Sequence, residues 1–453
     1  MSGIGGMKGK SVEQYLKQVC GHVKAKEVHA DIQLEMRSHL EELVDDKLSE
    51  GLTEAEAVQQ ALAQMGNPDD LGKQLHAAHK PRMEWSLAAI VAIMIGIGLL
   101  AMYSLQVAYL GQNIQYNVQL LFRKSFFTAI GIVLLVVIYF LDYRKLKKYS
   151  LYIYSGTVIL LVACSIYGTT INGAKRWFTA GSFTLNVYAL AAYLFLIALA
   201  GMLMSKGQAE QGKFKQAVQL VKIIVMFVLV PTLLYLQGNS FHSFIGYAFG
   251  LMIVVTYVSK SYKLFLTGAA TLAVIAGSLL ILMKERIYHS FERYFFFFMS
   301  SDSEWIGYQQ LNVIEAVRSA GLWGNGFGVT NNKIPYLQSE MVFTHLIYSF
   351  GWVFGGAVML LTVLFIVKAI TALRTLKDSY AKGLATAMLS IIGFHFVWNI
   401  MMSFGLMPIT AMNMPFISYG GTTGILELMA LGLVLSVCRR RNMISQASLE
   451  VKA

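Results

Sequence analysis

Ten long apolar stretches limit what this chain can fold into. They lie near residues 84–108, 121–141, 149–168, 187–204, 218–236, 241–258, 264–283, 341–367, 384–404 and 420–438. A helix needs about 20 apolar residues to cross the hydrocarbon layer of a membrane, and each stretch meets or nearly meets that length. Because lipid offers the backbone no hydrogen-bond partners, we expect each stretch to cross as an α-helix. The sequence predicts an all-α, polytopic membrane protein with about ten transmembrane helices.

Composition agrees with a membrane protein and argues against nucleic-acid binding. Of the 453 residues, 56% are hydrophobic and 14% are charged, and the mean hydropathy is +0.55. These values lie outside the usual range of soluble globular proteins. The formal net charge of +12 comes mainly from lysines and arginines in short loops between apolar stretches, as is typical of cytoplasmic loops. We therefore expect no nucleic-acid partner.

The three cysteines do not indicate a disulfide framework or a metal site. Cys20, Cys164 and Cys438 are far apart in the sequence, and their spacing matches no metal-binding pattern. We expect no cofactor, although the sequence leaves a divalent cation open.

The positions of the basic residues predict how the chain is oriented. Four basic loops and the basic tail fall on one side of the predicted helices: Arg144 to Lys148, Lys206 to Lys215, Lys260 to Lys263, Arg374 to Lys382, and Arg439 to Arg441. By the positive-inside rule, that side faces the cytoplasm. Both termini, including a tail at 442–453, are then cytoplasmic, and the loop 284–340 faces outward.

Residues 1–80 precede the first apolar stretch and predict a small bundle of about four helices. Thr53 and Glu56 form a capping box that opens a helix ending near Gly66. The segment from Glu50 to Leu75 resembles the helical prefix that precedes some bacterial permeases and membrane sensors. We interpret residues 1–80 as a cytoplasmic interaction or regulatory domain whose partner the sequence does not identify. With so long a polar segment first, no cleaved signal peptide is expected.

The outward loop 284–340 carries most of the unusual polar chemistry. Its last residue, Glu340, stands at the edge of the next apolar stretch, where an ionisable group is costly and therefore a functional candidate. Residues 286–298, with an aromatic run, are interpreted as an amphipathic segment on the membrane surface. The glycines of 321–328 lack the strand and helix context of a nucleotide site. We expect them to allow a tight turn or a close backbone approach.

A second outward segment contains Lys175, Arg176 and Trp177. Two adjacent cations beside an aromatic ring suit a phosphate or pyrophosphate head group at the membrane interface. A plain interfacial anchor explains the same residues equally well.

Four stretches at consistent spacing carry a family resemblance. They are Gly173 to Trp177; Gly307 to Gln309 followed by Gly321 to Gly328 and Tyr336-Leu337; Gln338 to Phe343 leading to Gly351; and Gly405 to Pro408 through Pro415 to Gly421. Together with Asn399, they identify residues 84–441 as similar to the FtsW, RodA and SpoVE (SEDS) family of bacterial shape, division and sporulation proteins.

The resemblance implies a peptidoglycan glycosyltransferase with the SEDS fold in the bacterial cytoplasmic membrane. Such a protein polymerises lipid II at the outer face and works with a membrane-anchored transpeptidase, a class B penicillin-binding protein. The family has a proposed catalytic aspartate in a His-Thr-Asp-Phe-Ile-Phe type motif, and this position is Glu340 here. The carboxylate is retained on a side chain one methylene longer.

Other family positions differ in this chain. An acid and a lysine of the family are replaced by Ala189 and Ala192, and a second acid by Asn239. An alternative therefore stays open: a member without activity that acts as a scaffold, a lipid-binding regulator or a lipid II transporter.

For the enzyme, we assign Glu340 as the general base that takes the proton of the attacking sugar hydroxyl. Lys175 and Arg176, beside Trp177, are the candidates for stabilising the leaving pyrophosphate, with Arg318 and Lys333 as further candidates. Ser418, Tyr419 and Gly420 are expected to form a turn that lines the lipid groove. The competing interpretation of Glu340 is a side chain at a helix start that only favours the helix dipole.

Overall fold

The computed structural model describes residues 8–78, 80, 83–111, 119–171, 174–181, 183–203, 221–259 and 304–441. Six helices in this part are long and apolar enough to span a membrane: α5 (Trp85–Gly111), α6 (Leu120–Phe140), α8 (Ser150–Tyr167), α16 (Val342–Arg374), α17 (Ser379–Ser403) and α18 (Thr422–Arg439). Three shorter apolar helices are α9 (Val187–Leu203), the segment Val221–Gln237 and α12 (Phe241–Ser259). These nine coincide with predicted stretches, so the multi-pass helical fold is confirmed.

Several predicted features lie outside the described residues. They are the apolar stretch 264–283, the amphipathic segment 286–298, the basic residues at 206–215 and 260–263, and the tail 442–453.

Two predicted helix boundaries differ from the structure. The helix predicted at 341–367 continues to Arg374, and the helix predicted at 384–404 begins at Ser379. Asp378 explains the second difference, because its carboxylate accepts hydrogen bonds from the amides of Tyr380 and Ala381 and caps α17. The Asp378 cap therefore starts α17 ahead of its apolar part.

The segment Val221–Gln237 contains a π-helical turn, Val225–Leu229, followed by α11 (Val230–Gln237). Pro231 follows this π-helical turn inside the continuous helical segment, where it has no amide hydrogen to donate. The Phe227 carbonyl, four residues earlier, accepts a hydrogen bond from the Tyr247 hydroxyl at 2.6 Å instead.

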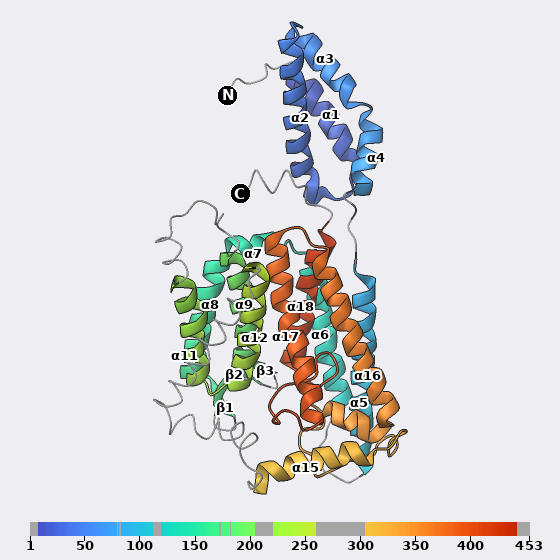
Figure 1. Ribbon diagram of the computed structural model, residues 1–453, viewed down its shortest axis with the longest axis vertical. Helices are drawn as coiled ribbons and strands as arrows, with labels where there is room; N and C mark the ends of the chain where they lie inside the picture. Colours follow the sequence, from blue (N-terminus) through green and yellow to red (C-terminus); the bar gives the residue numbers. More distant parts are fainter. Residues whose placement is uncertain are drawn as a thin grey trace. The chain divides into compact units, whose positions relative to one another are not determined.

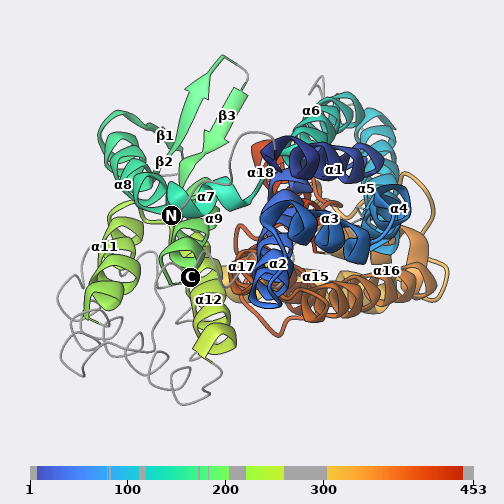
Figure 2. The ribbon, with the colours of Figure 1, turned by 90° about the horizontal axis from the view of Figure 1, so that it is seen from above.

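The membrane helices form two groups with α17 between them (Figures 1 and 2). On one side α8, α9 and α12 pack together, and on the other α16 packs on α5 and α5 on α6. Helix α17 contacts α9 and α12 on one side and α16 on the other. Close approach of α6 and α18 depends on glycine, because a Cβ at Gly432 would lie 2.8 Å from the Leu135 carbonyl oxygen.

The N-terminal residues form a separate compact unit, and its helices are α1 (Lys8–His22), α2 (His29–Ser49), α3 (Glu54–Met65) and α4 (Pro68–Ala78), with a short 3-10 turn, Lys26–Val28. Leu16, Leu40 and Val58 share its apolar core. The predicted capping box of Thr53 and Glu56 is confirmed.

One small sheet interrupts the helical fold between α8 and α9. Its strands are β1 (Thr169–Ile171), β2 (Ala174–Ala180) and β3 (Phe183–Asn186), paired antiparallel in that order. The apolar pattern did not predict these strands, because they are short and lie in a polar connection.

Helix α16 is broken at Gly351, whose φ of +84° is not helical. The glycine loop 321–328 occupies the break: the amides of Asn325 and Gly326 donate to the carbonyls of Tyr348 and Ser349. At the point of contact a Cβ on Gly324 would lie 2.5 Å from the Gly351 nitrogen. The loop glycines therefore serve a tight turn and a close backbone approach.

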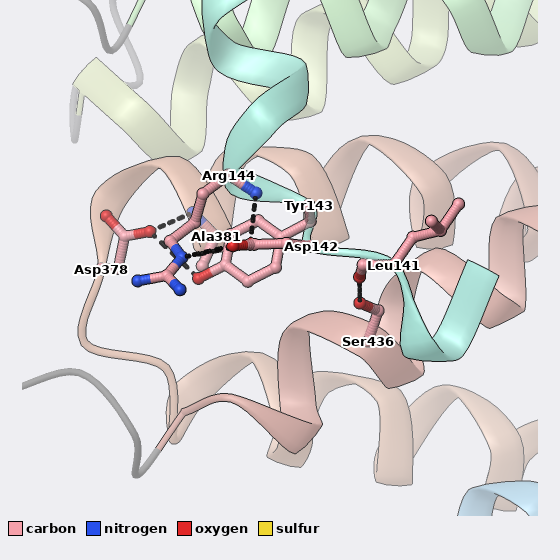
Figure 3. A network of polar contacts seen from close by, with 7 residues as sticks. All are labelled: Leu141, Asp142, Tyr143, Arg144, Asp378, Ala381 and Ser436. Carbon is pink, nitrogen blue, oxygen red and sulfur yellow. Dashed lines mark hydrogen bonds and ion pairs between the residues drawn. The ribbon is translucent and has the colours of Figure 1, made fainter. Parts of the chain in front are cut away.

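At one end of the membrane part, two basic connections come together (Figure 3). Short helix α7 (Arg144–Lys148) follows α6, and the Tyr143 hydroxyl lies 3.4 Å from the Asp378 carboxylate before α17. Arg144 pairs with Asp142, and Ser436 of α18 donates to the Leu141 carbonyl. The opposite end carries the sheet and α15 (Glu304–Ser319).

Candidate functional site

Glu340 lies in a turn immediately before α16. The turn is closed by hydrogen bonds from the amides of Ser339 and Met341 to the carbonyl of Tyr336, which has a positive φ of 58°. The Ser339 hydroxyl donates a short hydrogen bond to the Glu340 carboxylate. Burial raises the pKa of the Glu340 carboxyl above its usual range, and the Ser339 hydrogen bond opposes that rise. A half-buried carboxylate with a raised pKa suits proton transfer.

The Glu340 turn is fixed to α17 through Asn399. The buried Asn399 amide donates to the carbonyls of Glu340 and Met412, both at 2.8 Å. One side chain thus ties the candidate base to the segment 404–421 that connects α17 with α18.

That connecting segment also contacts the Glu340 turn directly. The Ser418 hydroxyl donates to the Ser339 carbonyl at 2.7 Å, and the Tyr419 amide donates to the Gln338 carbonyl at 2.8 Å. Two stretches whose bonded serines, Ser339 and Ser418, are 79 residues apart in the sequence therefore form one hydrogen-bonded unit around Glu340.

Two buried charged residues that the sequence analysis missed bind the same segment. The Lys124 ammonium of α6 donates to the carbonyls of Phe416 and Ser418 at 2.9 and 2.7 Å. The Glu427 carboxylate of α18 accepts a hydrogen bond from the Phe416 amide at 3.0 Å. Each was visible as a charge inside a predicted transmembrane stretch, which is itself a functional signal.

A pocket with about 530 Å³ of empty space lies between α9, α12, α17 and α18. Its polar lining includes Asn186, Tyr193, His242, Ser243, His395, Asn413, Thr423 and Glu427. Within the described residues, the Tyr193 hydroxyl and His395 Nδ1 are buried without a hydrogen-bond partner. Such groups favour a polar ligand or water. Ala189 and Ala192, where the family resemblance implies an acid and a lysine, also line this pocket.

The structure separates the two predicted pyrophosphate cations. Lys175 and Arg176 are neighbours on β2 and therefore project to opposite faces of the strand. Arg176 stacks on the Trp177 ring at 4.7 Å and lies 3.2 Å from Nδ1 of His242, a pocket residue. Lys175 is exposed and lies 3.4 Å from the Ile166 carbonyl. Among the residues the structure describes, neither cation forms an ion pair with Glu340.

Of the other predicted site residues, two are exposed and three lie at the Glu340 turn or in a second pocket. Arg318, at the end of α15, and Lys333 are exposed. Ser418 is buried and Tyr419 is half-buried, both bonded to the Glu340 turn, and Gly420 lines a second pocket of about 290 Å³ that includes Lys124. Within the described ranges, no cluster of three or more His, Cys, Asp or Glu could hold a metal ion.

Comparison with known proteins gives a match over the membrane part of the chain. The model of the FtsW/RodA/SpoVE family, described as cell cycle proteins, matches residues 84–443. A probable peptidoglycan glycosyltransferase FtsW of Caulobacter vibrioides is 25% identical over 362 residues, covering 79% of this chain and 89% of that protein. The peptidoglycan glycosyltransferase RodA of Treponema pallidum is 24% identical and covers 79% of this chain and 98% of that protein. Residues 1–83 precede the family match.

Solved structures agree with this fold. A chain of a peptidoglycan synthase complex that coordinates polymerization and crosslinking matches with a TM-score of 0.64 and 23% identity, covering 79% of this chain and 98% of that one. The rod shape determining protein RodA of Thermus thermophilus matches with a TM-score of 0.58 and 22% identity, covering 79% and 97%.

Proposed function

Because residues 84–443 place this chain in the FtsW/RodA/SpoVE family, we propose that it is a peptidoglycan glycosyltransferase that polymerises lipid II. The observation that carries the proposal is Glu340: a half-buried carboxylate, held by backbone contacts to the 404–421 segment, at the position where the family resemblance implies the catalytic acid. Relatives named as peptidoglycan glycosyltransferases support the same activity.

In this mechanism a sugar hydroxyl of one lipid-linked disaccharide attacks the anomeric carbon of another. Glu340 takes the hydroxyl proton, a contribution worth about 10²–10⁴-fold in rate. The bond to the polyprenyl pyrophosphate breaks as the new glycosidic bond forms. A raised pKa makes the ionised Glu340 a stronger base than an ordinary carboxylate.

Arg176 is the better of the two predicted cations for the leaving pyrophosphate. It lies beside a wall residue of the 530 Å³ pocket, His242, and the Trp177 ring holds its guanidinium in place. A guanidinium binds two phosphate oxygens at once. Lys175, Arg318 and Lys333 are exposed. Their proposed role is limited to contacts with the substrate's head group at the protein surface.

We also propose that both termini are cytoplasmic in a bacterial membrane and that Glu340 faces outward. The basic α7 and the connection around Lys377 share one end of the membrane part, which supports this orientation by the positive-inside rule. The similarity to a chain of a peptidoglycan synthase complex supports a penicillin-binding protein as partner.

The purified full-length protein tests this proposal directly. Incubated with labelled lipid II in proteoliposomes, it should yield glycan chains longer than one disaccharide. If it binds lipid II without extending it, the polymerase assignment is wrong.

One observation favours a second candidate, a lipid-binding protein without transferase activity. Ala189 and Ala192 line the pocket where the family resemblance implies an acid and a lysine. In that case lipid II binds, no chains form, and Glu340→Gln leaves the cellular phenotype intact.

A further inference from the structure

Two helices, α6 and α18, hold the segment beside the Glu340 turn. Helices α6 and α18 approach closely: a Cβ on Gly432 would meet the Leu135 backbone, and one on Gly131 the Leu428 side chain. Near one end of this contact each helix contributes a buried charge, Lys124 from α6 and Glu427 from α18.

Both charges bind the backbone of the same residue, Phe416. Lys124 holds the carbonyls of Phe416 and Ser418, and Glu427 holds the amide of Phe416. Phe416 has a φ of +63°, a left-handed conformation that a residue with a bulky side chain rarely adopts. The cation binds carbonyl oxygens and the anion binds an amide hydrogen, so each charge meets the backbone group of opposite polarity.

The held segment passes directly to the Glu340 turn. Ser418, whose carbonyl Lys124 binds, donates its hydroxyl to the Ser339 carbonyl and accepts from the Met414 amide. The path from Lys124 to Glu340 therefore runs through Ser418 and Ser339. Its two hydrogen bonds are both 2.7 Å long, and Ser339 is the covalent neighbour of Glu340.

We propose that Lys124 and Glu427 form a two-charge clamp that positions Glu340 for proton transfer. The clamp residues are positioning residues: they fix segment 414–419, and that segment fixes the Glu340 turn. The inference rests on the proposed role of Glu340. It also accounts for two charges buried in transmembrane helices, where apolar residues would cost less to bury.

The experiment replaces both charges together, since a single replacement leaves the other buried without its counter-charge. The full-length variant Lys124→Met with Glu427→Leu should fold with a lower thermal midpoint, because the Phe416 and Ser418 backbone groups lose these partners. Its kcat for lipid II polymerisation should fall about 100-fold, the size expected when a catalytic group is misplaced by about 1 Å. Its KM should stay near the wild-type value, because the clamp does not contact the substrate.

Two further variants complete the test. Ser418→Ala keeps both charges and removes one link to the Glu340 turn, and it should lower kcat with little change in KM. Ser436→Ala removes a comparable hydrogen bond at the far end of α18, to Leu141, and should leave kcat unchanged.

Each outcome decides the question. A wild-type kcat in the double variant or in Ser418→Ala overturns the clamp. A KM that rises in either variant by the same factor as kcat falls also overturns it. If the double variant does not fold, Ser418→Ala alone decides. If Glu340→Gln is as active as the wild type, the proposed function fails independently of the clamp. If the wild type makes no glycan chains, both fall.

Discussion

The environment of Glu340 is built from backbone contacts and one neighbouring hydroxyl. Its own carbonyl is held by Asn399, the carbonyl before it by Ser418, and its carboxylate by Ser339. With no ion pair to it in the described part of the chain, burial dominates and the pKa of Glu340 lies above its usual range. The carboxylate is therefore positioned by the fold and tuned by desolvation.

This environment predicts the pH dependence of activity. A general base works only when ionised, so kcat should fall on the acidic side, around a pH above the ordinary glutamate pKa of about 4.3. Ser339→Ala removes a hydrogen bond that favours the ionised form. In this variant the pKa rises further and the acidic limb of the kcat profile should move to higher pH. A shift to lower pH would contradict the assignment.

Sequence reasoning singled out Glu340, Asn399 and Ser418, but not Lys124 and Glu427, which hold the segment beside the Glu340 turn. Glu340 stands out because it lies at the edge of an apolar stretch. Lys124 and Glu427 are also charges in apolar stretches, yet their partners are backbone groups almost 300 and 11 residues away, respectively. Side chain to backbone contacts over such separations leave no pattern in the sequence.

The break in α16 is the main feature at the scale of the elements. The glycine loop pairs with the backbone on both sides of Gly351: the amides of Trp352 and Val353 donate to the carbonyls of Gly321 and Leu322. These bonds occupy polar groups that the broken helix leaves open, as a membrane environment requires. The loop lies between α15 and the Glu340 turn in the sequence and fixes the first turns of α16.

Replacing Gly324 should therefore destabilise the protein. Its φ is +79°, and a Cβ would lie within 2.5 Å of the α16 backbone. Gly324→Ala should lose about 1–3 kcal/mol from backbone strain alone, before the clash is counted. The control is Gly356→Ala on α16, where the added methyl group would meet open space. This variant should be neutral or stabilising. Thermal unfolding of both variants in detergent measures the difference, and equal midpoints would contradict it.

The apolar helices were predictable because their length and hydropathy are local properties. Nine predicted stretches match helices to within a few residues at most ends. The sheet could not be predicted in the same way, because its strands are 3, 7 and 4 residues long and owe their structure to mutual pairing. Its effect on the site is large: strand geometry sends Lys175 and Arg176 to opposite faces, which their adjacency in the sequence did not indicate.

At the scale of the molecule, the chain consists of a compact N-terminal unit and a membrane unit. Every contact described around Glu340, Arg176, Lys124 and Glu427 comes from residues of the membrane unit. The family match also begins only at residue 84. The N-terminal helices are proposed to bind a cytoplasmic partner and to take no part in the chemistry.

Deleting residues 1–83 tests this division of labour. The remaining protein should polymerise lipid II at the wild-type rate in proteoliposomes, because the candidate site is complete without the deleted helices. A folded deletion variant without activity would contradict this and assign the N-terminal unit a direct role in activation.

The central claim is that one carboxylate, Glu340, is the base for glycan polymerisation, and its amide variant tests it most directly. The matched control is Glu315→Gln, which changes an exposed carboxylate on α15, at the same end of the membrane part. With labelled lipid II in proteoliposomes, Glu340→Gln should lose about 10²–10⁴-fold in kcat, while Glu315→Gln keeps the wild-type rate. Equal rates for Glu340→Gln and the wild type would contradict the account.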